Sequence, residues 1–389
     1  MRVLIAPDCF TGTLTAEQAA VAIADGWRDG APHDVLTLRP LSDGGPGFLD
    51  VLSDALAGEV IVVPVSDPLG RTVPATVLLV AEGGRRTAYV ESAQACGLHL
   101  LLPEERDPAH TTTTGVGEMV AAAVDAGATR VVVGLGGSAT NDAGAGLLSA
   151  LGAGPPERLG RGGLALADVT VHDVAGLPAV LDRLRGVELV VATDVDNPLL
   201  GLDGATATYA AQKGAGPETA QTLEGSIGHL VDVVARVHAP ATDLLTGRPR
   251  RVEREPGAGA AGGLGWALML LGGHRVSGVA TVLEAVGFAD LLASHDIVVT
   301  GEGRLDWNSL RGKVVSGVAE AALGAAVPTV VIAGQVLVGR RETMAAGLSG
   351  TYAVAATAEE LDASLLDPVG ALRARTRRVA ATWSPGGGA

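Results

Sequence analysis

Two lysines are the first candidates for chemistry, because the other 26 of the 28 basic residues are arginines. They are Lys213, in Gln212-Lys213-Gly214, and Lys313, which follows Gly312. A lysine ammonium is a compact charge on a flexible stem, whereas a guanidinium is a rigid planar fork, so the two differ at a tight phosphate site. Glycine beside each lysine permits close approach of the backbone to a ligand. The pattern favours a phosphorylated ligand over the chance survival of two surface lysines.

Carboxylates follow several apolar runs. Asp8 comes after Arg2–Ala6, where it could bind a metal, orient a substrate or simply cap a turn. Asp194 and Asp196 come after Glu188–Ala192, and alternation along an extended chain sends both to one side. Two such carboxylates suit Mg²⁺, or one metal ligand and one general base. Structural Asx turns are the competing interpretation.

A small-residue loop follows the apolar run Arg130–Val133. It reads Gly134-Leu135-Gly136-Gly137-Ser138-Ala139-Thr140-Asn141-Asp142 and leads into an Ala-rich stretch with helical periodicity. Such a loop can aim several backbone N–H groups at an anion, assisted by the positive end of a helix dipole. A tight turn with close helix–strand packing is the structural alternative. The length and polarity of the loop favour anion binding.

Mixed charges follow a third apolar run, Asp296–Thr300. Glu302, Arg304, Asp306 and Lys313 lie within a dozen residues of one another there. Phosphoryl transfer needs carboxylates that hold a metal or accept a proton, and cations that offset the charge on the transferring group. A second glycine cluster, 257–265, permits close approach to either a phosphate or a neighbouring helix. Its composition does not choose between them.

The elements that must position these residues are short strands alternating with Ala-rich helices. Val60–Val65, Val73–Val80 and Pro328–Ala333 read as further strands, and Thr15–Asp29, Gly115–Ala126 and Ser309–Ala325 read as helices. Strand–loop–helix alternation predicts an α/β fold around mostly parallel sheets. The polar motifs fall at strand ends, where open α/β sheets bind ligands.

Composition limits the classes of partner. A net charge of −15 argues against nucleic acid or an anionic membrane as the main partner. Two cysteines, Cys9 and Cys96, cannot form a disulfide framework, which favours a reducing environment. No apolar run approaches the ~18 residues of a transmembrane helix, and the opening run is too short for a signal peptide. We therefore expect a cytoplasmic protein; a homo-oligomer is compatible with the sequence.

Taken together, these motifs resemble the bacterial glycerate kinase family. The resemblance is collinear from Ala6-Pro7-Asp8 to Lys313 and specific as a set, although each piece is modest alone. Besides the motifs above, it includes Asp43-Gly44-Gly45, Glu91 with Gly97-Leu98, Thr112-Thr113 with Gly115-Val116-Gly117-Glu118, Asp194–Leu199, Gln212–Ala215 and Gly301–Asp306.

The resemblance implies an architecture. We expect two α/β domains of three-layer, Rossmann- or flavodoxin-like type, with the second inserted in the first and the active site in the cleft between them. The first would comprise residues 1–65 and 285–380, and the inserted one residues 66–284. Residues 381–389, which end in Ser384-Pro385-Gly386-Gly387-Gly388-Ala389, would form a flexible tail.

The resemblance also implies an ATP- and Mg²⁺-dependent kinase that phosphorylates a hydroxyl of D-glycerate, usually the 2-hydroxyl. Asp194 or Asp306 would be the base, while Asp194, Asp196 and Glu302 would bind metal. Lys313, Lys213 and Arg304 would neutralise charge on the phosphoryl group and the substrate carboxylate. The remaining predicted binding residues are Asp8, Asp43, Gly44, Gly45, Gly136, Gly137, Ser138, Asn141, Asp142, Asn197, Gln212, Gly259 and Gly262.

The sequence departs from the family pattern at a few positions. Thr11 stands where a lysine is usual, and Pro46 where a glutamate is usual. Asn308-Ser309 replaces Gln-Thr, and Ala211 replaces a proline. The changes at 11 and 46 remove one charge of each sign. They motivate two alternatives: a kinase for a related small hydroxy or sugar acid, and a non-catalytic metabolite-binding paralogue; 3-phosphoglycerate is an alternative product.

Overall fold

The chain forms two compact units in the computed structural model, which describes residues 1–10, 12–238, 247 and 249–384. Unit 1 comprises Met1–Asp43, Asp50–Ala55 and Val279–Ala389, and unit 2 comprises Gly44–Leu49 and Leu56–Gly278. The predicted boundaries, after residues 65 and 284, differ from these. The main reason is β3 (Glu59–Ser66), which pairs with β4 (Thr72–Glu82) in the sheet of unit 2.

Unit 1 is built on a five-stranded sheet in the order β13–β11–β9–β1–β2, with every pair parallel. The strands are β1 (Arg2–Ile5), β2 (Val35–Leu38), β9 (Ile297–Thr300), β11 (Thr329–Ala333) and β13 (Gly350–Ala353). A short parallel pair, β10 (Arg304–Leu305) with β12 (Gln335–Val336), follows the carboxyl ends of β9 and β11. Parallel pairing places the segments after β1, β2 and β9 at one edge of the sheet.

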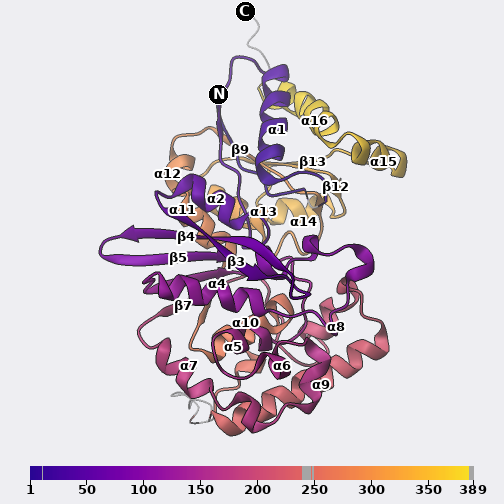
Figure 1. Ribbon diagram of the computed structural model, residues 1–389. Helices are drawn as coiled ribbons and strands as arrows, with labels where there is room; N and C mark the ends of the chain where they lie inside the picture. Colours follow the sequence, from indigo (N-terminus) through magenta and orange to yellow (C-terminus); the bar gives the residue numbers. More distant parts are fainter. Residues whose placement is uncertain (11, 239–246, 248, 385–389) are drawn as a thin grey trace, which may run out of the picture. The chain divides into compact units, whose positions relative to one another are not determined.

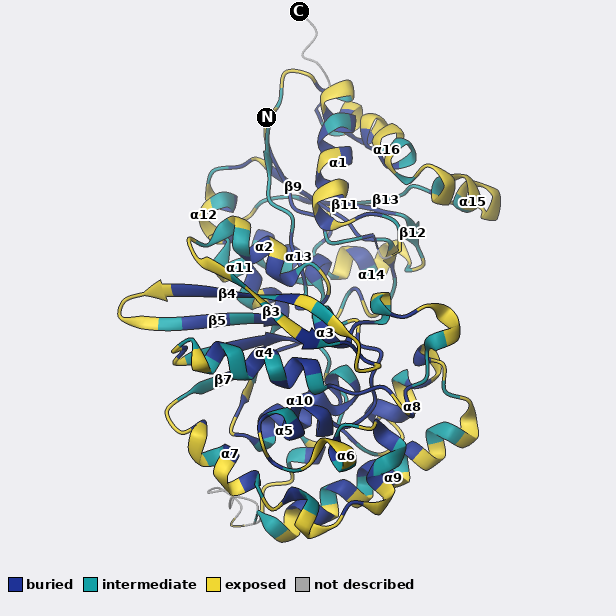
Figure 2. Cartoon of the chain, in the orientation of Figure 1, coloured by how far each residue is buried: buried dark blue, intermediate teal, exposed yellow. Residues whose placement is uncertain are grey.

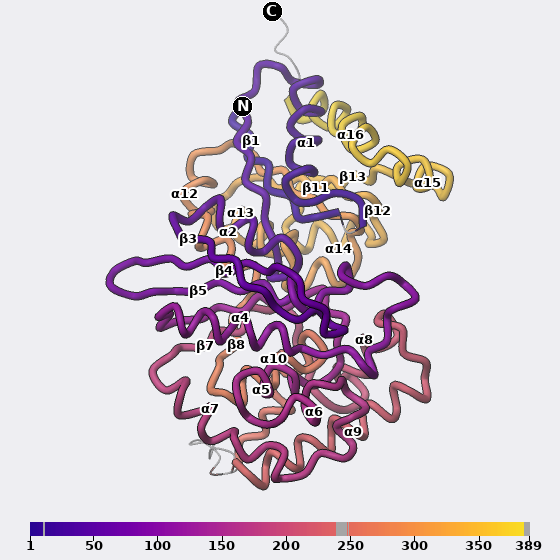
Figure 3. The backbone as a smooth tube through the Cα atoms, viewed as in Figure 1, coloured from indigo at the N-terminus to yellow at the C-terminus, as the bar shows by residue number. Residues whose placement is uncertain are grey.

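Helices cover both faces of this sheet. On β11, Val330 and Ile332 pack in one core with α1 (Ala16–Gly30) and α16 (Pro368–Trp383), while Val331 and Ala333 pack in another with α13 (Val314–Gly324). This alternation is the two-residue period of a strand. Figure 3 shows α1 and α16 side by side although they come from opposite ends of the chain. Unit 1 therefore has the expected three layers.

Helix α1 of unit 1 begins at a side-chain cap. At α1, the Thr15 hydroxyl accepts a bond from Gln18 N, and the Gln18 side chain accepts one from Thr15 N, which makes a capping box. The helix predicted from Ser309 begins only at Val314, because Lys313 is still extended. The remaining helices are α2 (Phe48–Ala55), α11 (Gly278–Ala285), α12 (Phe288–Ala293), α14 (Arg340–Ala345) and α15 (Ala358–Leu366), with α2 and α11 divided between the units.

The predicted flexible tail is wrong at its beginning. Residues 381–383 belong to α16, where Trp383 Nε1 donates to the Tyr352 hydroxyl at 2.9 Å. Ser384 is buried, and its hydroxyl donates to Asp34 Oδ1 at 3.0 Å. These contacts order the segment because they give its polar groups partners. Residues 385–389 lie outside the described part of the chain.

Unit 2 is built on a six-stranded mixed sheet in the order β3–β4–β5–β6–β7–β8. Four of these strands, β3, β4, β5 and β7, are labelled in Figure 1. The β3–β4 and β4–β5 pairs are antiparallel, and the other three are parallel. The strands not yet placed are β5 (Arg85–Glu91), β6 (Arg130–Gly134), β7 (Glu188–Ala192) and β8 (His274–Val276). The expectation of an α/β protein with mostly parallel sheets is therefore confirmed.

Helices of unit 2 bury one side against this sheet or against one another. Figure 2 shows the pattern on α9 (Pro217–Val237), where dark buried positions alternate with exposed ones; Leu223, Ile227 and Leu230 are buried at helical spacing. The others are α3 (Ala93–Cys96), α4 (Thr114–Asp125), α5 (Ala145–Ala150), α6 (Pro156–Leu159), α7 (Leu177–Arg183), α8 (Ala205–Tyr209) and α10 (Ala260–Leu270). Across the described ranges, no helix has the length and hydrophobicity needed to cross a membrane.

Candidate active site

Unit 1 gathers acidic residues around Lys313 at the carboxyl edge of its sheet. Asp8 follows β1, Asp43 follows β2, and Glu302 follows β9. Asp8 N donates to Gly301 O at 2.8 Å, which extends the β1–β9 pairing up to the two acids. Asp8, Asp43 and Glu302 all interact electrostatically with Lys313, the N-cap of α13. The structure thus brings together four predicted site residues from three separate segments of the sequence.

The charges in this group shift one another's ionisation. Burial, reinforced by repulsion from Asp43, raises the pKa of Asp8 well above its usual value, although a bond from Cys9 N opposes the shift. Burial also raises the pKa of Glu302, to about 7. Burial alone would lower the pKa of Lys313, but the surrounding carboxylates outweigh it and raise that pKa instead. Lys313 is consequently held in its charged form.

One oxygen of Glu302 stands out in this group. Glu302 is 7% exposed, and its Oε1 is buried without a hydrogen-bond partner within the described structure. A buried, unpaired carboxylate oxygen costs free energy, so it indicates a position where a ligand or metal completes the coordination. Ser309, which the sequence did not single out for a role, is buried beside this carboxylate and lowers the pKa of Glu302 by hydrogen bonding.

Asp306 and Arg304 take different positions in the same segment. Asp306 Oδ1 accepts from Asn308 N at 2.8 Å and from Ser309 N at 3.4 Å, which is an Asx-type turn. Its carboxylate interacts electrostatically with Lys313 and Glu302. The Arg304 side chain is exposed, beyond the buried part of the cluster.

In unit 2, the glycine loop after β6 packs against the Gly44–Pro46 segment. A Cβ on Gly136 would lie 2.6 Å from Gly45 Cα, and one on Gly137, at φ +63°, would lie 2.9 Å from Pro46 Cγ. Only glycine therefore fits either position. Gly137 itself is exposed, so the turn can also meet a ligand. The structure thus brings together the predicted residues Gly44, Gly45, Gly136 and Gly137.

The side chains at the end of this loop are buried and support its shape. Asp142 accepts bonds from Thr113 N and Oγ1, both at 2.9 Å, and from the N–H groups of Gly144 and Gly146. Burial raises the pKa of Asp142, while these bonds lower it. Asn141 Nδ2 donates to Thr206 Oγ1 at 3.0 Å. Both residues therefore stabilise the loop through hydrogen bonds to Thr113 and Thr206, partners that could not be predicted from sequence.

Lys213 lies inside unit 2 and is only 5% exposed. Its Nζ donates to Ser138 Oγ at 2.9 Å and to Thr140 O at 2.6 Å. Burial lowers the pKa of Lys213 to about 8. Its neighbour Gln212 is exposed instead. The predicted lysine is thus joined to the predicted loop, but its ammonium faces polar groups of the protein.

The segment after β7 carries three predicted site residues, Asp194, Asp196 and Asn197. The strand ends at Ala192, as predicted, and Asp194 and Asp196 follow it outside the sheet. The Asp196 side chain is 77% exposed and forms an ion pair with Arg275 Nη2 at 2.7 Å. Asn197 accepts from the Tyr209 hydroxyl at 2.8 Å and donates to Asp203 O at 2.7 Å. Asn197 therefore stabilises the loop through its side-chain hydrogen bonds. Asp194 is half-buried.

The second glycine cluster is explained by close packing. A Cβ on Gly259 would strike Pro198 O, and one on Gly262 would strike Thr140 O. Gly262 O also accepts a bond from Ala143 N at 3.0 Å, so this cluster packs directly on the loop after β6. Gly262 and Gly263 have positive φ within the first turn of α10. Composition left open whether these glycines approach a phosphate or a neighbouring part of the protein. The structure shows that they pack against a neighbouring segment.

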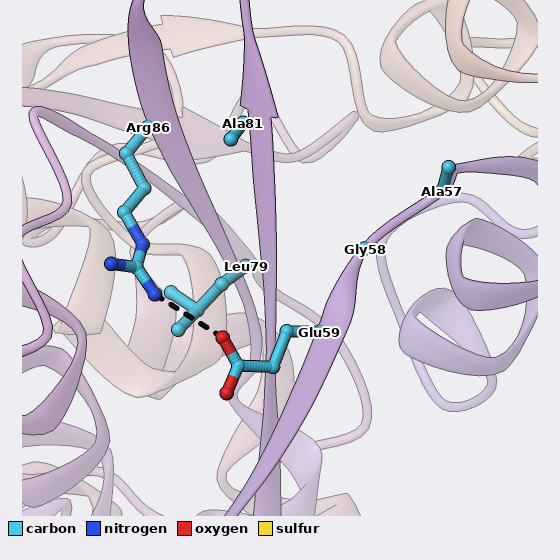
Figure 4. Close-up of a pocket in the computed structure, with 6 residues that line it drawn as sticks. All are labelled: Ala57, Gly58, Glu59, Leu79, Ala81 and Arg86. Atoms are coloured by element: carbon cyan, nitrogen blue, oxygen red, sulfur yellow. Dashed lines mark hydrogen bonds and ion pairs between the residues drawn. The ribbon is translucent and has the colours of Figure 1, made fainter.

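The predicted metal ligands are not gathered within one unit. Glu302 belongs to unit 1, whereas Asp194 and Asp196 belong to unit 2. Among the described residues, no group of three His, Cys, Asp or Glu side chains is arranged to hold a metal ion. A surface hollow in unit 2 lies over β3, β4 and β5, lined by Ala57, Gly58, Glu59, Leu79, Ala81 and Arg86 (Figure 4). It contains a Glu59–Arg86 ion pair at 3.3 Å and none of the predicted site residues.

Comparison with known proteins decides the family. The sequence profile of the glycerate kinase family matches residues 3–384. The chain belongs to the glycerate kinase family. It is therefore an enzyme of a kinase family, as the motifs predicted.

Individual glycerate kinases are similar over most of their length. The glycerate kinase of Bacillus subtilis is 43% identical over 341 residues, which cover 86% of this chain and 85% of that protein. The glycerate 2-kinase of Escherichia coli is 35% identical over 392 residues and 99% of each chain. A crystal structure of a protein proposed as glycerate kinase 2 from Salmonella typhimurium LT2 has a TM-score of 0.74 and 37% identity over 99% of each chain. The similarity thus extends through the segments that carry both lysine sites.

Proposed function

We propose that this chain transfers the γ-phosphoryl group of ATP to a hydroxyl of D-glycerate, with 2-phosphoglycerate and ADP as products. Membership of a kinase family supports ATP as the donor, and the names of the B. subtilis and E. coli relatives support glycerate as the acceptor. The observation that carries the proposal is the position of Lys313. It lies where adjacent parallel strands end, among one buried carboxylate, that of Glu302, and the half-buried carboxylates of Asp8 and Asp43, and phosphoryl transfer uses such a combination of a cation and carboxylates.

The reaction needs one proton acceptor and at least one fixed positive charge. The substrate hydroxyl oxygen bonds to the γ-phosphorus, the bond from that phosphorus to the bridging oxygen of ADP breaks, and the hydroxyl proton passes to a carboxylate. Asp194 and Asp306 are the two proposed bases. Lys313 offsets the charge that spreads over the transferring group, and we assign the exposed Arg304 to the substrate carboxylate or an outer phosphate.

The turn Gly136–Ser138 is the proposed anion site of unit 2. Gly137 is exposed, and its small size allows backbone N–H groups to approach an oxygen closely. Asp8 and Asp43, with Gly44 and Gly45 next in sequence, remain proposed substrate- or nucleotide-binding residues. We propose that residues of both units serve this single reaction, as the family resemblance implies.

We propose that Mg²⁺ enters together with ATP. In kinases Mg²⁺ is usually held by one or two carboxylates together with substrate phosphates, and it neutralises charge on the phosphate oxygens. Glu302, with its buried unpartnered oxygen, fits this requirement, and Asp8 beside it supplies a second carboxylate. Asp196 fits less well, because its carboxylate is exposed and paired with Arg275. Asp194 stays a candidate ligand as well as a candidate base.

A related hydroxy acid is the second candidate substrate, and Pro46 favours it. Pro46 replaces the usual glutamate and packs against the exposed turn at Gly137. Removal of a carboxylate there changes the charge offered to a small acid. The other departure, Thr11, lies outside the described residues.

A coupled ADP-release assay across several acids tests the proposal. With MgATP, we expect turnover with D-glycerate and much less with tartronate or short aldonates; ³¹P NMR of the product distinguishes the 2-phosphate from the 3-phosphate. Turnover only with another acid would assign that acid as the substrate. If ligands stabilise the protein against heat but no acid releases ADP, the chain is a metabolite-binding paralogue.

The setting of the enzyme follows from its chemistry and charge. A net charge of −15 supports small-molecule partners and argues against nucleic acid or anionic membranes. We propose a cytoplasmic location, where ATP and free thiols are both found. We also propose that the protein can form a homo-oligomer, and light scattering of the purified protein measures its oligomeric state.

A further inference from the structure

The buried ammonium of Lys213 is placed to act through Ser138. Nζ donates to Ser138 Oγ at 2.9 Å and to Thr140 O at 2.6 Å, and all three groups are at least nine-tenths buried. No carboxylate forms an ion pair with this ammonium among the described residues. The Lys213 ammonium therefore donates its hydrogen bonds to two neutral oxygens of the loop after β6.

The direction of the bond to Ser138 follows from chemistry. An ammonium carries three donors and no acceptor, so Ser138 Oγ must accept from Lys213. The hydroxyl proton of Ser138 is then directed elsewhere, and within the described structure it meets no acceptor. A hydroxyl that accepts from a cation is also polarised, which makes it a stronger donor. The Ser138 hydroxyl is thus available as a hydrogen-bond donor to an acceptor atom of a ligand.

The backbone around Ser138 is fixed while the turn before it is accessible. Leu98 N donates to Gly137 O at 2.8 Å, and Ala139 N donates to Cys96 O at 2.7 Å, which clamps the turn from one side. Gly136 is half-buried and Gly137 is exposed, so an approaching ligand meets these two glycines first. The next side chain along the loop is the Ser138 hydroxyl.

We propose that Lys213 is a positioning residue that sets the Ser138 hydroxyl as a hydrogen-bond donor to an anionic oxygen bound at the Gly136–Ser138 turn. This inference rests on the proposed function, in which two ligands carry such oxygens: the phosphates of ATP and the carboxylate of glycerate. Ser138 touches the ligand, whereas Lys213 acts on it only through Ser138.

The ionisation of Lys213 provides a readout that a purely structural role lacks. Burial lowers the pKa of Lys213 to about 8, and the titratable groups that interact with it are Cys96 and Asp142. Burial raises the pKa of the Cys96 thiol to about 12, so Cys96 stays neutral over the relevant range. Above pH 8 the neutral amine can accept a hydrogen bond, and the Ser138 proton can turn toward Nζ. Anion binding should then weaken as the pH rises.

The experiment compares Lys213→Met, Ser138→Ala, the double variant and Thr111→Val. Thr111→Val is the matched control, because the Thr111 hydroxyl donates to Ala139 O at 2.9 Å and so anchors the same loop without touching Ser138. Calorimetry measures the Kd of ADP and of D-glycerate between pH 6.5 and 9.5, and steady-state kinetics measure KM and kcat.

For one of the two ligands, we expect wild-type affinity to fall about tenfold as Lys213 deprotonates, the value of a good hydrogen bond to a charged group. Lys213→Met and Ser138→Ala should each weaken that ligand about tenfold at pH 7 and abolish the pH dependence, and the double variant should be no worse than either. Thr111→Val should keep the wild-type pH dependence. The ligand that responds identifies the source of the anionic oxygen.

Independent, additive losses in the two single variants would overturn the proposal, as would a wild-type affinity that does not change with pH. If Lys213→Met fails to fold, wild type against Ser138→Ala across pH still decides the matter. Binding of ADP is measured without turnover, so failure of the glycerate kinase assay and failure of this inference are separate results.

Discussion

The two lysines of this chain occupy opposite electrostatic environments. Lys313, in unit 1, interacts with four carboxylates, those of Asp8, Asp43, Glu302 and Asp306, and they raise its pKa. Lys213, in unit 2, is deeply buried and donates to two neutral oxygens, and its pKa falls to about 8. The same side chain is therefore a permanent cation in one unit and a titratable donor in the other. Carboxylates outweigh the loss of hydration around Lys313, whereas around Lys213 the effect of Asp142 is smaller than that of burial.

This contrast suggests a division of labour. A lysine that stays charged can offset the negative charge of a transferring phosphoryl group, which demands a cation throughout the reaction. A buried lysine with a pKa of about 8, which donates to two protein oxygens, is suited to stabilising a loop. Substitutions at the two sites should accordingly differ in size and in pH dependence.

Lys313→Met should have the largest effect on activity. Loss of the cation should lower kcat by about 100- to 1000-fold, the range found when one charge-stabilising donor is removed from an active site. Steady-state ADP release measures it, and Lys313→Arg tests whether charge alone suffices. A loss no greater than that of Lys213→Met would remove the distinction between the two sites.

The position of the base tells which unit contributes the proton acceptor. The two variants to compare are Asp306→Asn, in unit 1, and Asp194→Asn, in unit 2. The variant that removes the base should have a kcat at least ~100-fold lower than wild type. The other substitution should be milder. Rapid-quench measurement of the chemical step separates this loss from slow product release. Turnover close to wild type in both variants would reject both assignments.

Asp142→Ala should reduce stability more than it alters chemistry. The substitution leaves Thr113 N and Oγ1 and the N–H groups of Gly144 and Gly146 without their common acceptor. We expect a loss of about 3 kcal/mol in the free energy of unfolding, since buried donors left unpaired cost ~1–3 kcal/mol and some of these will recover partners. Urea unfolding measures it. An unchanged midpoint would mean that the loop does not depend on this carboxylate.

The pH dependence of stability should show burial acting on each site. Lys213 has a folded pKa of about 8, below its usual 10.5, so the unfolded chain binds more protons between these values and stability should rise with pH there. Glu302 has a folded pKa of about 7, above its usual 4.5, so stability of the ligand-free protein should fall as pH rises from 4.5 to 7. Denaturant unfolding across pH tests both.

Variants assign these two slopes to their residues. Lys213→Met should remove the rise above pH 8 while the fall below pH 7 stays, and Glu302→Gln should do the reverse. Persistence of either slope in its own variant would show that another group is responsible.

Asp196→Asn should have the smallest effect. The carboxylate is 77% exposed and its ion pair with Arg275 is screened by solvent, so we expect a change of less than about twofold in kcat and almost none in stability. The same ADP assay and urea series measure it. A tenfold loss of activity would restore Asp196 as a metal ligand.

Sequence alone determined the class of fold and the residue types of the site. Alternation of β-branched runs with Ala-rich helices predicted parallel α/β sheets, and the position of acids and glycines after the strands predicted where Asp8, Glu302 and the Gly136–Ser138 turn would lie. These predictions succeed because strand periodicity and strand ends are local properties of a chain. The rarity of lysine likewise singled out both lysine sites.

Tertiary structure alone decided what each side chain faces. Asp142 and Asn197 are polar residues in promising motifs, yet they fix loops, because their partners Thr113 and Tyr209 come from elsewhere in the chain. The opposite pKa shifts of the two lysines have the same origin. A pKa is set by burial and by charges within a few ångströms, and these distances are known only once distant segments have been brought together.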